Sequence, residues 1–366
     1  MRIVPYDEFR SAKFEASWKL ILEDTNALGD IGNSYEWNKC WWETYKSSGV
    51  ATRDLFVLAD DAQGKITAIW PLFIRHRYGM KTIHWIGQAD GMITDYMAPV
   101  LSEQDKGKQV FNFINYLYEN TSYWDVVDLK IPQWANLLTP FIKNFVLTGK
   151  ELGLQWQLNV SDNAVVVDLT ADFETYLSQL GKQTKTHVRQ YLRGATRNNI
   201  HLGIYKGPSL VDKLPILFEL NSMNWQIFQT DIARNFLLDV AGQFARNHSS
   251  LFLACLSCDE KCIATALGFE KNDTCYIHPA GIIRKQISGI SPGITMYALL
   301  IQSLIERGFK KLDLSPGLEE YKLRLGGHIE PVYQFLVWHK SSKINRWRMF
   351  DWLRKKRESQ RQPKIS

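Results

Sequence analysis

Long hydrophobic runs and a secretion signal are missing from this 366-residue chain. It contains no run of about 18 apolar residues, so the sequence predicts no helix that spans a membrane. The N-terminal segment MRIVPYDEF lacks the charged-then-apolar pattern of a secretion signal. We therefore expect a cytoplasmic protein.

Cysteine is scarce as well. The chain has five cysteines, an odd number that suits a reducing compartment better than a disulfide framework. Four of them are spaced in a way that resembles a zinc site: Cys255, Cys258, Cys262 and Cys275. They fall around two strand-like runs joined by a short turn, Leu251–Ser257 and Cys262–Phe269, so we predict ordinary strand positions and no metal.

The remaining composition is that of a globular protein, with 45% hydrophobic and 22% charged residues. The net charge of +6 is concentrated near the C-terminus, in Lys340–Ser366, where basic residues alternate with Trp347, Phe350, Trp352 and Leu353. This tail suits an anionic membrane surface, which would place the protein peripherally on the inner face of the membrane. Nucleic-acid contact and a solvated end are the alternatives; no DNA partner is expected.

The two halves of the chain share one pattern. Leu55–Phe73 aligns without a gap with Leu251–Phe269, and both predict a hairpin. A strand-like run, a helix and a buried strand then follow in each half: Asp95–Leu101, Val110–Tyr118 and Val126–Lys130 in the first, and Tyr276–Gly281, Ser291–Arg307 and Lys311–Leu314 in the second. We predict an α/β fold with mixed sheets, built as a domain over residues 1–165, a second over 166–339 and a tail over 340–366.

The second copy carries a helix start that could bind an anion. Ser291 is expected to cap the helix, and Gly293 lets a ligand approach the backbone. Apolar residues recur at helical spacing over Ile294–Ile305. Unpaired N–H groups and the positive end of the helix dipole would suit a phosphate there, although a capped core helix explains the same pattern. Tyr321 and Lys322 follow the next predicted strand.

Short motifs in both halves carry a family resemblance. In the first half they are Trp37–Trp42, Pro71-Leu72 and Thr94-Asp95-Tyr96 with Pro99; in the second they are Phe173–Arg197, Ser291-Pro292-Gly293 and Asp313 through Gly317 to Tyr321-Lys322. In this order they resemble the acyltransferase domain named for the bacterial cellulose-biosynthesis protein CelD, within the GNAT (N-acetyltransferase-like) superfamily. The resemblance implies two tandem GNAT-like domains, as in Fem-type peptidoglycan aminoacyltransferases, with a degenerate first copy and a catalytic second copy.

One departure from the superfamily concerns the acyl donor. The acetyl-CoA signature, Gln/Arg-x-x-Gly-x-Gly/Ala at the start of a helix, is replaced by Ser291-Pro292-Gly293. Proline removes one N–H donor. Acetyl-CoA therefore stays one candidate beside a longer acyl-CoA, an acyl carrier protein and an aminoacyl-tRNA.

Candidate site residues follow from the chemistry of acyl transfer, which needs a base, a stabilised oxyanion and a proton for the leaving group. The resemblance implies Tyr321 as the proton donor. Asp313, Glu320 and His278 are candidate bases, although an Asp that caps a turn and a structural His are equally ordinary.

Other residues are candidates for binding the donor and the acceptor. We assign Ser291, Gly293, Ile294, Lys322, Lys185 and Arg189 to donor binding, and Trp225, Asp95 and Tyr96 to the acceptor side. Lys185 and Arg189 belong to a basic stripe at helical spacing: Lys182, Lys185, Arg189, Arg193 and Arg197. Such a stripe favours an anionic partner, with a solvated helix face as the alternative.

The function that follows is transfer of an acyl group, most simply acetyl, from a CoA-type thioester to an amine or hydroxyl of a cell-envelope or polysaccharide precursor. The co-substrate would be acetyl-CoA or another acyl-CoA, and the acceptor a small molecule or a glycan precursor. A non-catalytic factor for exopolysaccharide or cellulose assembly and an aminoacyl-tRNA-dependent, Fem-like transferase are the alternatives.

Overall fold

The structure is a computed structural model that describes residues 1–24, 31–48, 51–62, 64–88, 94–102, 106–146, 153–225, 227–247, 250–284, 287 and 289–339. The basic tail 340–366 lies outside the described residues.

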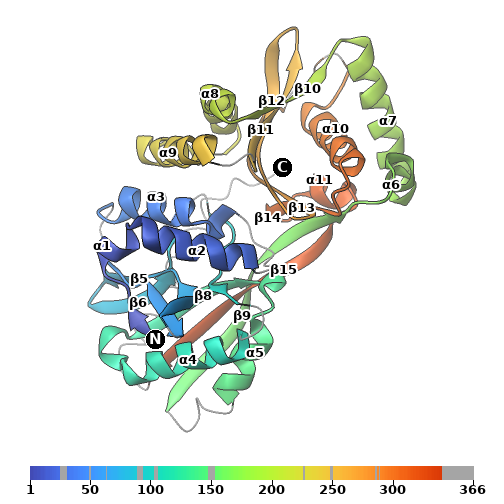
Figure 1. The fold of residues 1–366 in the computed structure, drawn as a ribbon. Coiled ribbons are helices and arrows are strands. Elements are labelled where there is room, and N and C mark those ends of the chain that lie inside the picture. The colour runs from blue at the N-terminus through green and yellow to red at the C-terminus, as the bar shows by residue number, and fades with distance from the viewer. Residues whose placement is uncertain are drawn as a thin grey trace.

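Figure 1 shows two lobes joined by a pair of long strands. We call residues 1–153 the first lobe and residues 169–327 the second lobe; β9 (Leu154–Asp168) and β15 (His328–His339) connect them.

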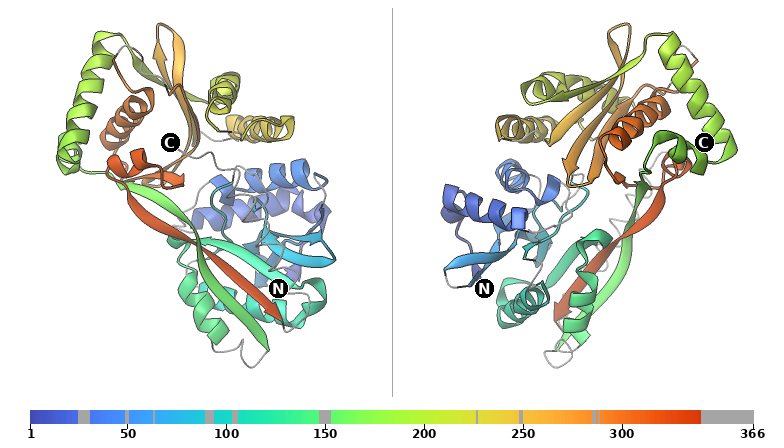
Figure 2. Two further views of the ribbon diagram at one scale, coloured as in Figure 1. Left: turned by 180° about the vertical axis from the view of Figure 1, so that it is seen from behind. Right: turned by 45° about the vertical axis from the view of Figure 1, so that its right-hand side comes forward.

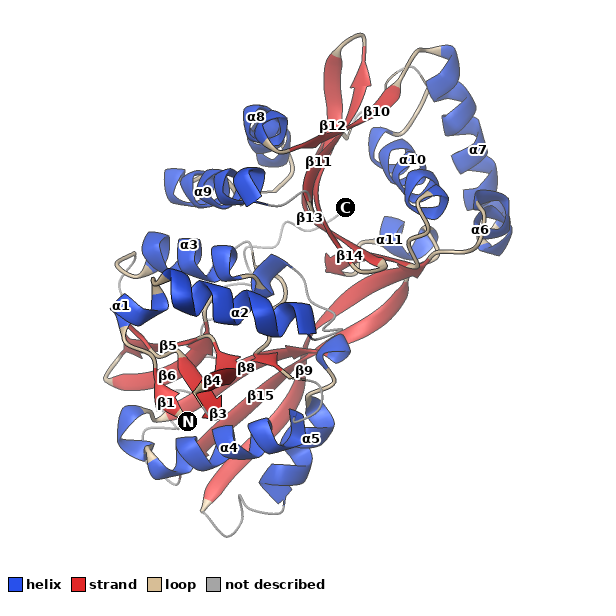
Figure 3. Ribbon diagram, viewed as in Figure 1, coloured by secondary structure: helices blue, strands red, loops and turns tan. Residues whose placement is uncertain are grey.

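One large sheet runs through both lobes (Figure 3). Its strands, in spatial order, are β10 (His201–Lys206), β11 (Leu251–Cys258), β12 (Lys261–Lys271), β13 (Thr274–Ile282), β14 (Lys311–Pro316), β9, β15, β8 (Val126–Pro132), β6 (Met80–Trp85), β5 (Leu72–Arg77) and β2 (Thr52–Leu55). A smaller sheet in the first lobe has the order β1 (Arg2–Ile3), β3 (Leu58–Ala62), β4 (Lys65–Trp70) and β7 (Val100–Leu101). Most neighbouring strands are antiparallel, but β13 pairs with β14, and β6 with β8, in parallel.

Helices cover both lobes. The first lobe contains α1 (Tyr6–Phe9), α2 (Ala12–Asp24), α3 (Tyr35–Tyr45), α4 (Lys106–Glu119) and α5 (Leu138–Asn144). In the second lobe, α8 (Pro208–Ser222) and α9 (Asp231–Asn247) lie on one face of the sheet, whereas α7 (Lys182–Arg197) and α10 (Pro292–Glu306) lie on the other (Figures 1 and 2). The short helices α6 (Phe173–Gln179) and α11 (Glu320–Arg324) lie near α10.

The predicted α/β fold with mixed sheets is confirmed, and the internal repeat is visible in the order of elements. In pairing and order, β2, β5, β6, α4 and β8 of the first lobe match β11, β12, β13, α10 and β14 of the second, and the parallel pair β6–β8 corresponds to β13–β14. The expected hairpin Leu55–Phe73 is wrong as the counterpart of Leu251–Phe269, because its strands β3 and β4 belong to the smaller sheet. The run Asp95–Leu101 was expected to be a strand, but only Val100–Leu101 is one. The four cysteines that resemble a zinc site occupy β11, β12 and β13, as expected.

The two lobes share strands instead of meeting at a linker. The expected boundary between residues 165 and 166 falls inside β9. The last described strand, β15, pairs with β9 along its whole length and with β8 of the first lobe. The C-terminal part of the described chain therefore completes a sheet that also belongs to the N-terminal half.

Aromatic residues fill the interior. In the first lobe Trp70 stacks on Phe113 with ring centroids 3.9 Å apart, and between the lobes Trp37 of α3 meets Phe236 of α9 edge to face at 4.9 Å. All four side chains are at least 98% buried, and each such ring contributes roughly 1.5–3 kcal/mol by burial alone.

Among the residues that the structure describes, no helix combines the length and the apolarity that a membrane crossing requires.

Candidate active site

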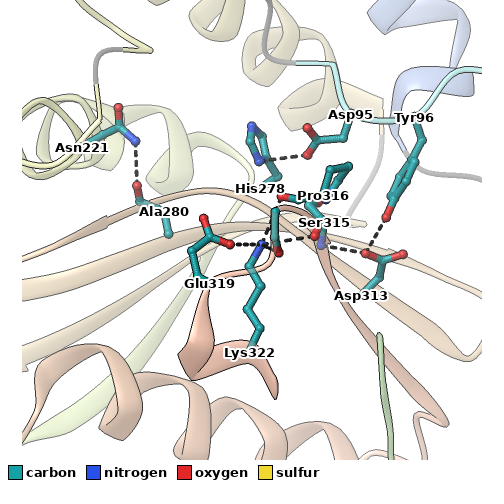
Figure 4. Close-up of polar contacts among 11 residues, drawn as sticks. Asp95, Tyr96, Asn221, His278, Ala280, Asp313, Ser315, Pro316, Glu319 and Lys322 are labelled. Atoms are coloured by element: carbon teal, nitrogen blue, oxygen red, sulfur yellow. Dashed lines mark hydrogen bonds and ion pairs between the residues drawn. The ribbon is translucent and has the colours of Figure 1, made fainter. Parts of the chain in front are cut away.

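The candidate site lies where two parallel strands of the second lobe separate. β13 and β14 pair only from Thr274 with Lys311 to Tyr276 with Asp313. Beyond this point β13 continues through His278, while β14 stays paired on its other edge with β9, from Lys311 with Asp168 to Pro316 with Ala164. Asp95 and Tyr96 of the first lobe reach this point, one beside each strand (Figure 4). Two adjacent residues of one lobe thus contact both separating strands of the other.

His278 and Asp95 form an ion pair between the lobes. Nδ1 of His278 lies 2.9 Å from Oδ2 of Asp95, and the side chains are 27% and 15% exposed. The two groups are close, although Oδ2 of Asp95 has no partner with hydrogen-bond geometry in this structure. Nε2 is the ring's other nitrogen and is left for a proton transfer. The sequence suggested both residues separately, 183 positions apart, but gave no sign that they meet. The structure brings them together in an arrangement suited to a general base.

Asp313 is held in a buried setting by Tyr96. The Tyr96 hydroxyl donates to Oδ1 of Asp313 at 2.9 Å, and the Ser315 N–H donates to the same oxygen at 2.7 Å. Burial raises the pKa of Asp313 to about 7, although both hydrogen bonds lower it. Tyr96 is only 1% exposed. Its expected contact with substrate is therefore wrong: Tyr96 joins the lobes and positions Asp313.

Lys322 has a structural role, and its expected contact with a donor phosphate is wrong. Its ammonium donates to the carbonyl oxygens of Ser315, Pro316 and Gly317 at 3.1–3.2 Å and lies 2.9 Å from Oε2 of Glu319. The residue is 4% exposed. An ammonium has three protons, and these partners use all of them. Lys322 closes the turn between β14 and α11 (Figure 4).

Tyr321 and Glu320 are adjacent on α11 but lie in different surroundings. The Tyr321 ring stacks on Tyr297 of α10 at 5.5 Å. Burial raises the pKa of Tyr321 well above its usual value, so the phenol stays protonated at neutral pH. Glu320 is 76% exposed and pairs with Arg324 at 2.5 Å. Glu320 therefore lies in solvent, where its role as a base stays a prediction, and Tyr321 lies buried beside Tyr297, where its role as a proton donor stays a prediction.

Helix α10 begins where the sequence predicts, directly after Ser291, but the Ser291 side chain does not cap it. Ser291 is the N-cap, yet its side chain makes no capping hydrogen bond. Its carbonyl oxygen instead accepts from the Thr295 N–H at 2.9 Å and from the Thr295 hydroxyl at 2.8 Å. The N–H groups of Gly293 and Ile294 belong to the first helical turn, where the helix offers no carbonyl partner. They are the donors that this helix end can present to an anion.

Two asparagines at the end of α8 fix the outer part of β13. Asn221 is fully buried and its side-chain amide donates to the Ala280 carbonyl at 2.7 Å; the Asn224 amide donates to the Ile282 carbonyl. A Cβ on Gly281 would lie 2.7 Å from the backbone nitrogen of Asn221, so only glycine fits between them. Trp225 follows directly and is half-buried. The sequence analysis includes Trp225 among the candidates but not Asn221. The Asn-x-x-Asn spacing at the end of a helix is the pattern that could have indicated Asn221.

The basic stripe is confirmed as one side of α7. Lys182, Arg193 and Arg197 are exposed, and Arg189 pairs with Glu174 of α6. α7 packs against α10, and Gly194 lies so close to Ile290 that a Cβ would meet its side chain at 2.8 Å. Lys185 is nine residues from Gly194, about 14 Å along the helix. The end of α7 that carries Arg193 and Arg197 is therefore nearer to the start of α10 than Lys185 and Arg189 are.

Comparison with known proteins identifies the domain type. Residues 182–323 match the model of an acetyltransferase (GNAT) domain. No curated protein sequence matches the chain. The matched residues include β13, α10 and β14, so this part of the second lobe is similar to a GNAT-type acetyltransferase domain.

Solved structures of similar fold cover nearly the whole chain. FemX is similar with a TM-score of 0.57 at 10% identity, over 88% of this chain and 94% of its own. L-PGS from Bacillus licheniformis gives 0.55 at 11% identity, over 90% and 94%. The C-terminal domain of a protein described as a lysylphosphatidylglycerol synthetase from Agrobacterium fabrum gives 0.54 at 14% identity, over 92% and 95%. At these identities the likeness concerns the fold.

Proposed function

We propose that this protein transfers an acyl group from a CoA-type thioester to an amine or hydroxyl, and that the reaction takes place where β13 and β14 separate. The observation that carries the proposal is the ion pair of His278 with Asp95, which lies at the separation point and keeps the imidazole partly exposed. The GNAT-type domain supports acyl transfer as the reaction class.

The residues take distinct roles in this proposal. Asp95 holds the proton of His278 on Nδ1, and Nε2 accepts the proton from the attacking amine or hydroxyl. The Tyr321 phenol, which is protonated at neutral pH, donates a proton to the leaving sulfur, although burial raises its pKa and so makes it a weaker acid. Asp313 and Lys322 hold β14 and the turn after it in place. A general base of this kind contributes about 10²–10⁴-fold, and the acid contributes less, because a thiolate leaves readily.

The donor side is proposed at the start of α10. The N–H groups of Gly293 and Ile294 and the positive helix end would bind a phosphate group of an acyl-CoA. Arg193 and Arg197, at the nearby end of α7, add positive charge. An acyl-CoA would supply the activated thioester. The site offers fewer N–H donors than a glycine-rich start, because residue 292 is proline.

The acceptor is proposed to be a precursor of the cell envelope or of a polysaccharide. Its support is the resemblance to the CelD-like family and the fold shared with proteins named FemX and lysylphosphatidylglycerol synthetase. Trp225, which follows the asparagines that hold β13, is proposed to line the acceptor side.

A second candidate, an aminoacyl-tRNA-dependent transferase, is favoured by the length of the basic stripe. From Lys182 to Arg197 it extends about 22 Å, which is more than the phosphates of one CoA need. The fold shared with FemX is compatible with it. A non-catalytic assembly factor, with the tail 340–366 contacting an anionic membrane, is the remaining alternative.

A thermal-shift panel with the full chain tests these functions. Acetyl-CoA, longer acyl-CoAs and free CoA are compared at equal concentration, and a ligand at 100 times its Kd should stabilise the fold by about 2.7 kcal/mol. Stabilisation by CoA species, lost on Gly293→Leu, supports the proposed donor site. No shift with any CoA contradicts a CoA donor. Activity that is sensitive to RNase then indicates the tRNA-dependent reaction, and no transfer from any donor indicates the assembly factor.

A further inference from the structure

The segment of the first lobe that carries Asp95 is held by close backbone packing. Residues 94–97 lie against Gly32, which precedes α3 in the chain. A Cβ on Gly32 would lie 2.2 Å from the carbonyl oxygen of Tyr96 and 3.0 Å from Cγ2 of Thr94. The first distance is shorter than any real contact between such atoms, so only glycine fits at this position. The backbone beside Asp95 therefore has little freedom to move on this side.

Trp37 of α3 holds the same segment through a side chain. Its indole Nε1 donates to Oγ1 of Thr94 at 2.9 Å, and the residue is 2% exposed. Thr94 directly precedes Asp95, so this hydrogen bond is one peptide unit away from the residue that meets His278. The Trp37 ring also packs edge to face on Phe236 of α9 at 4.9 Å. Trp37 thus contacts both the segment that carries Asp95 and a helix of the second lobe.

Helix α3 is in turn fixed to the residues that hold this segment. The Ser34 hydroxyl oxygen caps the helix and accepts from the Trp37 N–H at 3.2 Å. The side-chain amide of Asn38, which is 0% exposed, donates to the carbonyl oxygens of Gly32 and Ser34 at 2.8 Å each. Gly32, the start of α3 and residues 94–97 therefore form one packed unit.

We propose that Trp37 is a positioning residue, which holds Thr94 and thereby sets Asp95 against His278. A reacting group must be kept within about 0.5 Å of its productive geometry by packing and by hydrogen bonds to its neighbours. This support matters most where the two partners belong to different lobes, and Trp37 contacts both lobes. The role of the pair in proton transfer rests on the proposed function, whereas the position of Asp95 can be measured without any substrate.

Trp41, one turn further along α3, provides a matched control. It is 0% exposed and packs against Tyr45 at 5.4 Å and Phe73 at 5.2 Å. Its Nε1 has no hydrogen-bond partner in the part of the chain that the structure describes. Trp37→Phe and Trp41→Phe therefore remove the same atoms from the same helix. Only Trp37→Phe removes a hydrogen bond to the segment that carries Asp95.

The ring nitrogens of His278, observed by ¹⁵N NMR in the full chain, test the proposal. Their signals report which nitrogen carries the proton, and this depends on the group beside Nδ1. His278→Gln assigns the signals, and Asp95→Asn gives the reference shift. We expect Trp37→Phe and Thr94→Val to shift the signals in the same direction as the reference. Trp41→Phe should leave them in place, and Thr94→Ser, which keeps the acceptor oxygen, should restore what Thr94→Val loses.

The variants also separate positioning from packing and from catalysis. Equal shifts in Trp37→Phe and Trp41→Phe would overturn the proposal, because the effect would then come from the packing of α3. Signals that stay in place in Trp37→Phe would overturn it as well. Thermal melts show which variants are folded, and if Trp37→Phe is not, the comparison of Thr94→Val with Thr94→Ser decides. If Trp37→Phe shifts the signals but His278→Gln keeps its kcat, the positioning stands and the proposed general base fails.

Discussion

Two of the histidine–aspartate pairs, one inside the first lobe and one between the lobes, have different surroundings. In the first lobe, Nδ1 of His84 on β6 lies 3.8 Å from Oδ2 of Asp128 on β8, and both side chains are at least 91% buried. Gln334 donates to Oδ1 of Asp128 at 2.8 Å. Between the lobes, His278 and Asp95 are closer, at 2.9 Å, and His278 is 27% exposed. The same residue types thus form a core contact inside one lobe and a candidate base where the lobes meet.

The strands around the two pairs are arranged alike. In the first lobe, β6 pairs with β8 in parallel only from Thr82 with Val126 to Ile83 with Val127, and His84 and Asp128 are the next residues on these strands. In the second lobe, β13 and β14 pair in parallel only as far as Tyr276 with Asp313. The contrast therefore lies in burial: the side chains at the first separation point are enclosed, whereas the second keeps the imidazole of His278 partly exposed.

Replacing the histidine of each pair should produce the largest contrast. His278→Gln removes the proposed base and should lower kcat about 10²–10⁴-fold with little change in Tm. His84→Gln, the matched control in the first lobe, should lower the free energy of unfolding by about 1–3 kcal/mol and leave kcat unchanged. Steady-state kinetics and thermal melts measure both. Equal kcat values for the unaltered chain and His278→Gln would remove His278 from the mechanism.

Lys322→Met should mainly reduce stability. The substitution leaves Glu319 and three carbonyl oxygens without the ammonium that they share. We expect the free energy of unfolding to fall by about 3 kcal/mol in denaturant titrations. Lys185→Met on α7 is the control, with a change of about 0.5 kcal/mol or less. If Lys322→Met instead keeps its stability and loses acyl-CoA binding, the phosphate-binding role is restored.

Asp313→Asn should change how stability depends on pH. The folded-state pKa of about 7 lies above the ordinary aspartate value of 3.8, so the folded protein binds a proton that the unfolded chain has released. The unaltered chain therefore loses stability as the pH rises from about 4 to about 7, by up to about 4 kcal/mol. Relative to it, Asp313→Asn should gain stability over this range, measured by urea unfolding at several pH values. A difference that is constant with pH would refute the buried neutral carboxyl.

Tyr321→Phe should give the smallest effect. Loss of the phenol removes the proposed proton donor, but a thiolate leaves readily, so we expect kcat to fall about 10- to 100-fold. Tyr297→Phe, its stacking partner, is the control and should keep kcat within a few-fold. The comparison uses single-turnover rates. Loss of activity in both variants to the same extent would show that the stacked pair is needed for packing only.

Local patterns predicted the elements that carry the site. The bounds of α10 and β14, the hairpin β11–β12 and the basic side of α7 all follow from capping residues and periodicity in a single segment. The sequence also placed Asp95, His278, Asp313 and Tyr321 among the candidates. These predictions need only neighbours in the chain.

The remaining features depend on contacts between distant segments. Nothing in the sequence indicates that Asp95 meets His278, because the contact requires one lobe to reach the separated strands of the other. It suggested Lys322 as an exposed cation, whereas the turn at Ser315–Gly317 encloses its ammonium. It placed a boundary at residue 165, whereas β15 returns to the first lobe. Periodicity describes one segment at a time and does not contain this information.

The return of β15 has a consequence for synthesis of the protein. Domains generally fold in order as they leave the ribosome, the N-terminal one first. Here β8 of the first lobe acquires its neighbour only when His328–His339 has emerged, after the whole second lobe has been translated. The first lobe must therefore wait with one side of β8 uncovered, and we expect ribosome-bound chains that stop before residue 328 to be cut by protease within the first lobe.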